Sequence, residues 1–160
     1  MGSKNGRNKA AATNGAVKGS SMTFQQALQR HLTAVQEHDL DTFIDTIASD
    51  GSLAMILPNG NYLDEYQAIV ELHQEWFADP EWRMSVELVN QRETPAMASA
   101  LCLVTYEDVD EAGEPVQFQY FLNLIFAKQG NKWLLVHDQN TIIDLADDHE
   151  DDDHEDEEDE

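Results

Sequence analysis

Basic residues and cysteine are scarce in this sequence, and each shortage excludes a class of function. Only nine residues are Lys or Arg, against 32 Asp or Glu, which gives a formal net charge of -23. Nucleic acids and anionic membrane surfaces are bound through basic surfaces, so we expect neither as a partner. The single cysteine, Cys102, excludes an intramolecular disulfide and a cysteine-rich zinc site. No apolar run approaches the length of a membrane span, and a reducing cytoplasm is the default location.

Both ends of the chain differ in composition from the middle. Residues 1–21 contain four bases, no acid and no aromatic residue, and they lack the continuous apolar stretch of a secretory signal. Residues 144–160 contain 13 Asp or Glu residues, which repel one another and stay solvated. We therefore predict a disordered or artificially added leader, a disordered acidic tail, and one domain over residues 22–143. That domain remains acidic, with 19 acids against five bases.

Helical periodicity dominates the first half of the domain. Helices are predicted over residues 23–38, 40–48 and 64–77. In the first of these, apolar residues recur at three- and four-residue steps, Thr23 can cap the N-terminus, and His31 lies within the apolar stripe. Asp39 can cap the second helix, and Asp79-Pro80 ends the third.

Alternating β-branched and aromatic residues dominate the second half, with turn residues between the runs. Strands are predicted over residues 52–57, 82–92, 97–108, 116–128 and 132–141. Helices followed by a long antiparallel meander are typical of an α+β domain. The strand over residues 116–128 is apolar on both faces, so both faces must be covered. The helices can cover one face, and we expect the other to form a homodimer. The residues expected on this outer face are Phe118, Tyr120, Leu122, Leu124, Trp133 and Leu135.

Two motifs and the order of the elements resemble a known superfamily. The first motif is Glu37-His38-Asp39-Leu40-Asp41, followed by a short helix that ends at Ser49-Asp50-Gly51. The second is the final strand GNKWLLVHD, from Gly130 to Asp138. Together they resemble the nuclear transport factor 2-like superfamily, which contains SnoaL-like and ketosteroid-isomerase-like domains. The resemblance implies a cone-shaped α+β barrel, in which three N-terminal helices pack on a strongly bent antiparallel sheet around one pocket.

The resemblance also allows a residue-by-residue comparison with ketosteroid isomerases. It aligns His31 with the oxyanion-hole tyrosine of that family, Met55 with the general-base aspartate, and Asn123 with a protonated aspartate. Methionine cannot accept a proton, so steroid isomerisation by that mechanism is not expected. The strand over residues 116–128 also lacks the arginine that limonene epoxide hydrolases require.

The same comparison proposes a pocket between the helices and the concave face of the sheet. The candidate catalytic residues are His31, His73 and Asp138. Ile125 and Cys102 are also expected to point inward. The candidate ligand-binding residues are Trp76, Phe77, Val104, Tyr106, Phe121, Asn123, Val136 and Asn140. We expect no metal and no cofactor, and we place His137 on the opposite face of the last strand.

Each polar candidate also has a purely structural interpretation. His31 and His73 can be core histidines with satisfied hydrogen bonds, and Tyr106 can be a packing residue with its hydroxyl at the rim. Asp138, on a largely apolar strand, cannot be buried without compensation. It needs either a partner such as His31 or His73 or a role as an acid/base with a raised pKa. A histidine partner would lower the pKa of Asp138 and raise that of the histidine, whereas the pKa of an isolated Asp138 would be raised.

Two functions remain open from the sequence. The first is an acid/base enzyme of the isomerase, cyclase or lyase type that acts on a small hydrophobic molecule. The second is a non-catalytic, homo-oligomeric domain for ligand binding or association. Members of the superfamily serve both kinds of function, so the fold does not choose between them.

Overall fold

The computed structural model describes residues 21–143, so the predicted leader, apart from Ser21, and the predicted tail lie outside the described part. The helices are α2 (Phe24–Gln36), α3 (Leu40–Thr46) and α4 (Tyr66–Phe77). The strands are β1 (Ala54–Ile56), β2 (Tyr62–Leu63), β3 (Arg83–Glu93), β4 (Met97–Val109), β5 (Pro115–Gln129) and β6 (Lys132–Ile142). The four long strands begin and end within one residue of the predicted bounds.

Local sequence explains where α2 begins and ends. Thr23 and Gln26 form a reciprocal capping box at its N-terminus, with each side chain bonded to the backbone of the other. The predicted apolar stripe is buried, including His31. The turn after the helix contains His38 in the left-handed conformation, with φ of 56°. The ring of His38 stacks on Trp82 at a centroid distance of 3.9 Å.

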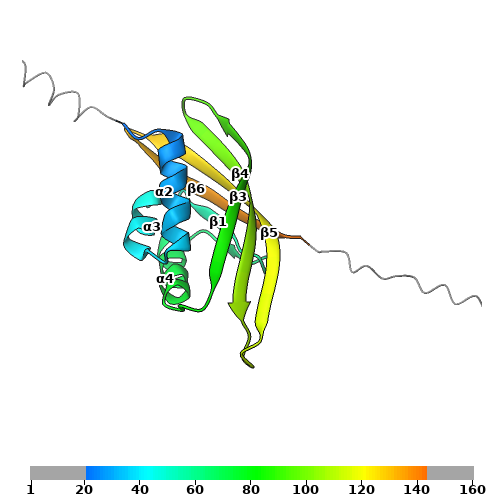
Figure 1. Cartoon of the computed structure of the whole chain (residues 1–160). Helices are drawn as coiled ribbons and strands as arrows, with labels where there is room; N and C mark the ends of the chain where they lie inside the picture. The colour runs from blue at the N-terminus through cyan, green and yellow to red at the C-terminus, as the bar shows by residue number, and fades with distance from the viewer. Residues whose placement is uncertain (1–20, 144–160) are drawn as a thin grey trace, which may run out of the picture.

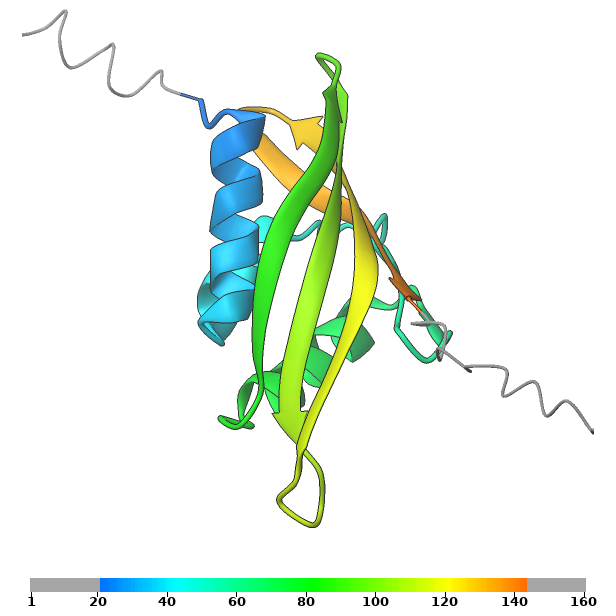
Figure 2. The same ribbon diagram turned by 45° about the vertical axis from the view of Figure 1, so that its right-hand side comes forward.

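The six strands form one sheet in the order β2-β1-β6-β5-β4-β3. All three helices lie on one side of this sheet, and the long strands bend and twist around them (Figures 1 and 2). The predicted α+β fold class is therefore confirmed. The sheet is mixed rather than purely antiparallel, because β1 pairs in parallel with β6, and Met55 faces Asp138 in the register.

The orientation of β5 differs from the sequence-based expectation. Its even-numbered residues from Tyr120 to Phe126 are buried under the helices, whereas Phe121 is 38% exposed on the other face. Phe121, Asn123 and Ile125 therefore point outward, and the expectation that they line the inner face is wrong. Both faces of β5 are apolar, so alternation alone could not choose between them. Against the helices, the even-numbered set supplies the larger aromatic surface.

A β-bulge in β6 explains a second difference. The register with β5 shifts between Ile125–His137 and Phe126–Leu135, which leaves Val136 as the extra residue. Trp133 and Leu135 therefore face the core before the bulge, and Asp138 faces it after the bulge. The inward orientation expected for Val136 is wrong.

These two findings also overturn the residues assigned to the outer face. Six residues were expected at a dimer interface: Phe118, Tyr120, Leu122, Leu124, Trp133 and Leu135. All six belong to the hydrophobic core or pack against it. The apolar side chains that do face outward on β4 and β5 include Met97, Leu101, Leu103, Phe121 and Ile125. His137 pairs with Ile125 and lies on the outer face, as predicted.

A pair of adjacent alanine substitutions tests the orientation of β5. Leu124 is fully buried, so Leu124→Ala should lower the free energy of unfolding by about 2–5 kcal/mol, since it creates a cavity in the core. Ile125→Ala removes a similar side chain from the outer face and should cost about half of that or less. Urea denaturation of both variants measures the difference. Equal losses, or a larger loss for Ile125→Ala, would contradict the orientation.

Candidate functional site

A cavity of about 550 Å³ lies between the helices and the concave face of the sheet. Its polar lining comes from five elements and two loops: His31, Asn59, His73, Glu75, Trp76, Asp79, Tyr106, Tyr120, Asp138 and Asn140. Its apolar lining consists of Leu32, Val35, Phe43, Met55, Leu57, Pro58, Leu72, Met84, Phe118 and Leu122. The cavity is therefore a largely apolar space with a few polar groups, the usual composition of a small-ligand site.

Among the described residues, Asp138 is the only buried acid of the cavity, with 8% of its surface exposed. It lies just beyond the bulge of β6, between Met55 on β1 and Leu124 on β5 in the register. Burial raises the pKa of Asp138 to about 7, although a hydrogen bond from Asn140 acts in the opposite direction. The carboxyl group is thus held where it can exchange a proton at neutral pH.

Asn140 holds the Asp138 carboxyl in place. Its Nδ2 donates to the Asp138 Oδ1 at 2.9 Å and to the Ile56 carbonyl at 2.8 Å. Both amide hydrogens are therefore used within the protein. The second bond also ties the end of β1 to β6, so the carboxyl is fixed relative to both strands.

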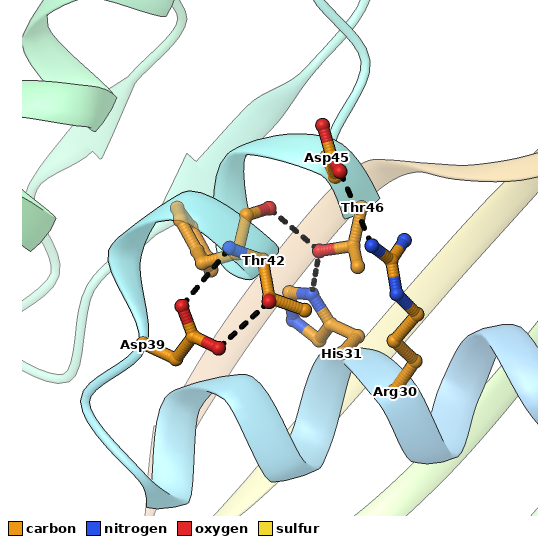
Figure 3. A network of polar contacts seen from close by, with 7 residues as sticks. Arg30, His31, Asp39, Thr42, Asp45 and Thr46 are labelled. Carbon is orange, nitrogen blue, oxygen red and sulfur yellow. Dashed lines mark hydrogen bonds and ion pairs between the residues drawn. The ribbon is translucent and has the colours of Figure 1, made fainter.

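His31 enters the cavity from α2 through a network that fixes its tautomer (Figure 3). The Thr46 hydroxyl donates to the Phe43 carbonyl at 2.7 Å, so its oxygen must accept a hydrogen from His31 Nδ1, 2.8 Å away. The neutral ring therefore carries its proton on Nδ1 and an unprotonated Nε2. Burial, with the nearby His73 as a smaller cause, lowers the pKa of His31 to about 3.

The rest of the network in Figure 3 supports this position from outside the cavity. Arg30 pairs with Asp45 at 3.1 Å, which joins α2 to α3. Asp39 caps α3 by accepting from the Thr42 amide and hydroxyl. These contacts hold the short helix that carries Thr46 against α2.

His73 has the same tautomer for a different reason. Its Nδ1 lies 2.7 Å from the Ile69 carbonyl one helical turn earlier, and a carbonyl can only accept. The ring stacks on Phe43 at a centroid distance of 4.1 Å. Burial lowers the pKa of His73 to about 4, although the bond to the Ile69 carbonyl raises it. Both histidines are therefore neutral at physiological pH, each with an acceptor at Nε2.

The structure decides between the two states considered for Asp138. Among residues 21–143, no hydrogen bond or ion pair joins Asp138 to either histidine. The pKa shifts have the directions expected for an isolated buried carboxyl and two neutral buried imidazoles. All three predicted catalytic residues line one cavity, but they do not form a His–Asp pair.

The side chains of Trp76, Tyr106 and Phe118 form an aromatic wall of the cavity. Trp76 Nε1 donates to the Tyr106 hydroxyl at 3.2 Å, and that hydroxyl lies 3.3 Å from the Asp108 carboxylate, to which it donates. Trp82 stacks behind Trp76 at 4.2 Å. Burial raises the pKa of Tyr106 to about 12, so its hydroxyl stays protonated. Trp76, Tyr106 and Asn140 thus line the cavity as predicted, and their binding role remains a prediction.

The other predicted lining residues lie elsewhere. Val104 and Phe77 are buried but pack behind the lining. Phe121, Asn123 and Val136 do not line the cavity, for the reasons given by the orientation of β5 and the bulge in β6. Sequence reasoning missed Phe118, Tyr120 and Leu122, which take their place on β5. The larger aromatic content of the even-numbered residues was the one signal that could have revealed them.

Neither a metal site nor a membrane span is evident in the described part of the chain. Residues 21–143 contain no group of three or more His, Cys, Asp or Glu side chains that could hold a metal ion. Over the same range, no helix is both long and apolar enough to cross a membrane.

Three helices packed against a curved sheet around a cavity define the nuclear transport factor 2-like class, and solved structures share this fold. A candidate calcium/calmodulin-dependent protein kinase type II association domain from Thiobacillus denitrificans has a TM-score of 0.65 at 16% identity, over 76% of this chain and 96% of that chain. A candidate dehydratase of the nuclear transport factor 2-like family from Streptomyces avermitilis has a TM-score of 0.62 at 12% identity, over 73% and 91%. A candidate ketosteroid isomerase from Shewanella frigidimarina has a TM-score of 0.61 at 10% identity, over 76% and 97%.

Within this class the chain belongs to the SnoaL-like domain family, whose sequence profile matches residues 25–143. No curated protein sequence matches the chain. At these low sequence identities, the likeness to solved structures shows the fold and not the function.

The raised pKa of Asp138 predicts a specific pH dependence of stability. The folded state keeps the Asp138 proton up to about pH 7, whereas the unfolded state releases it near 3.8. Stability therefore falls as pH rises between these values, by up to about 1.4 kcal/mol per pH unit. Asp138→Asn removes this cost, so the variant should gain stability relative to the parent from pH 4 to pH 8.

Urea unfolding at several pH values measures this difference. The histidine contributions, which are lost as pH falls below 6.5, are common to both proteins and cancel. Glu87→Gln, which removes an exposed acid from the outer face, is the matched control and should show no such trend. A carbon NMR titration that placed the Asp138 carboxyl midpoint near 4 would contradict the prediction.

Proposed function

We propose that the cavity binds a small, largely apolar molecule and that Asp138 exchanges a proton with it, in a reaction of the isomerase, cyclase or lyase type. The observation that carries this proposal is a buried carboxyl with a pKa of about 7 and no charged partner among residues 21–143. A group that titrates near the working pH is suited to general acid or base catalysis. The apolar lining excludes water and increases the effect of each polar contact.

The three predicted catalytic residues have different roles in this proposal. Ionised Asp138 takes a proton from the bound molecule, and protonated Asp138 returns it to another atom, so the reaction needs no net proton. His31 and His73, with pKa values of about 3 and 4, are too weakly basic to remove that proton. Each instead offers an acceptor nitrogen that can orient a hydroxyl or N–H group of the ligand.

The position of Asp138 agrees with this role. Met55, aligned by the resemblance with the general base of ketosteroid isomerases, is the direct neighbour of Asp138 across the parallel β1–β6 pair. The carboxyl comes from β6 rather than β1, but it faces the same part of the cavity.

Solvent deuterium exchange tests the proposal. Small neutral ketones and phenols are screened in D2O at pH 7 for binding, by quenching of Trp76 fluorescence, and for exchange of a carbon-bound hydrogen, by NMR. Asp138→Asn should abolish exchange while folding is kept, and it should change the binding of these neutral molecules less than threefold. Glu87→Gln should leave exchange and binding unchanged. Exchange by the Asn variant at the rate of the parent would refute the role of Asp138.

A second function, non-catalytic association, is favoured by the outer face of the sheet. Phe121 is 38% exposed there and pairs with Leu103, with Leu101 two residues away on β4, and Met97 is 48% exposed at the start of the same strand. Apolar patches of this kind on soluble domains commonly mark protein interfaces. Association domains are among the chains that share the fold. We therefore propose a homodimer through this face, with interface residues that differ from those first predicted.

The oligomeric state can be tested with two variants of one strand. Phe121→Glu places a charge on the outer face and should convert the dimer to a monomer in light scattering at micromolar concentration. Val116→Glu is the control, because Val116 lies on the same strand and is 40% exposed, but belongs to the other face. A monomeric parent, or dissociation by both variants alike, would contradict the interface.

A further inference from the structure

The polar side chains of the cavity are unbalanced, since acceptors outnumber free donors. The Nε2 atoms of His31 and His73 are free acceptors, because both rings carry their hydrogen on Nδ1. Neither Nε2 has a partner among residues 21–143, and the two side chains are only 2% and 5% exposed. The Asp138 carboxylate and the Asn140 carbonyl oxygen add further acceptors to the lining.

The donors of the lining are largely used within the protein. Both Asn140 amide hydrogens, the Trp76 indole and the Tyr106 hydroxyl have partners there. When Asp138 is ionised, the side-chain donors without a partner among the described residues are the Tyr120 hydroxyl and the Asn59 amide, which lies exposed at the mouth. A ligand rich in acceptors would find few partners, whereas a ligand rich in donors would find several.

The charged groups of the lining also favour a ligand that donates hydrogen bonds, and in particular a cation. Within residues 21–143, no Lys or Arg lines the cavity, while Glu75 and Asp79 stand exposed at its mouth and Asp138 lies inside. Trp76, Tyr106 and Phe118 also line the cavity, and aromatic rings attract cations that lie over their faces. An anion entering the cavity would meet carboxylates and no compensating base. A cation would meet favourable groups from the mouth to the interior.

We propose that the ligand of this cavity is a hydrophobic amine or a related nitrogen cation, whose N–H groups donate to Asp138 and to the free nitrogens of His31 and His73. This inference rests on the proposed function and names the class of molecule bound. The apolar body of the ligand lies against Leu122, Met55 and the aromatic wall. Binding favours ionised Asp138, so uptake of the cation below neutral pH releases a proton.

Six other titratable side chains line the cavity that contains Asp138. They are His31 on α2, His73 and Glu75 on α4, Asp79 after α4, Tyr106 on β4 and Tyr120 on β5. Burial keeps both histidines neutral down to about pH 4, and it raises the pKa of both tyrosines. Of the buried groups, Asp138 alone therefore changes charge between pH 6 and pH 8.

Three molecules of one shape test the inference. Calorimetric titration of the full chain compares 4-phenylbutylamine, 4-phenylbutan-1-ol and 4-phenylbutanoate at pH 8 and pH 6. We expect the amine to bind at least tenfold more tightly than the alcohol at pH 8, and the carboxylate to bind most weakly. The affinity for the amine should fall about tenfold at pH 6 because Asp138 is then protonated. At pH 6, two buffers of different ionisation enthalpy should reveal proton release.

Two variants separate the local charge from the overall charge of the protein. Asp138→Asn should lower the affinity for the amine at least tenfold and change that for the alcohol less than threefold. Glu87→Gln removes the same charge from the outer face, so it should change neither affinity more than twofold. Should the Asn variant fail to fold, the pH dependence and proton release of the parent still decide the matter.

The outcomes distinguish this inference from the proposed function. If the alcohol or the carboxylate binds as tightly as the amine, the cation preference is wrong while the apolar pocket stands. Amine binding that is independent of pH would also overturn the inference, because Asp138 would not be the anchor. If none of the three binds at millimolar concentration, both the inference and the proposed small-molecule pocket are wrong.

Discussion

The arrangement of the cavity depends on the β-bulge at Val136. Before the bulge, Trp133 and Leu135 of β6 complete the apolar core beneath α2. After it, the same strand turns Asp138 and Asn140 toward the cavity. With regular alternation, a strand that buried Leu135 would expose Asp138 on the outer face. Because of this one inserted residue, β6 contributes apolar side chains to the core before the bulge and a titratable side chain to the cavity after it.

Local hydrogen bonds then determine what each polar group in the cavity can do. His31 and His73 give their single ring hydrogens to Thr46 and to the Ile69 carbonyl, and Asn140 gives both of its amide hydrogens to neighbours. Each bond satisfies a donor and leaves an acceptor directed at the cavity. Burial suppresses protonation of the histidines and ionisation of Asp138 by the same desolvation. The interior is therefore nearly uncharged at neutral pH, and Asp138 is the group whose charge changes there.

The two faces of the sheet suit different functions, which explains how one fold can host enzymes and association domains. The inner face carries the cavity and its carboxyl. The outer face carries exposed Phe121 and Met97 and contributes nothing to the lining. Either face can change without disturbing the other because side chains alternate across the strands.

The sequence by itself determined the elements and the protein class. The stripe of α2, its capping box at Thr23 and Gln26, and the bounds of the long strands depend on neighbours within a few residues along the chain. Local periodicity and turn residues therefore report them. The tertiary structure decided which face of β5 is buried, where β6 bulges, and that Asp138 has no histidine partner. These features depend on packing between segments far apart in the chain, and on two faces of β5 that are apolar alike. No local sequence pattern distinguishes the two orientations of β5 or the position of the bulge, because the free energies of these alternatives differ only once the helices cover one face of the sheet.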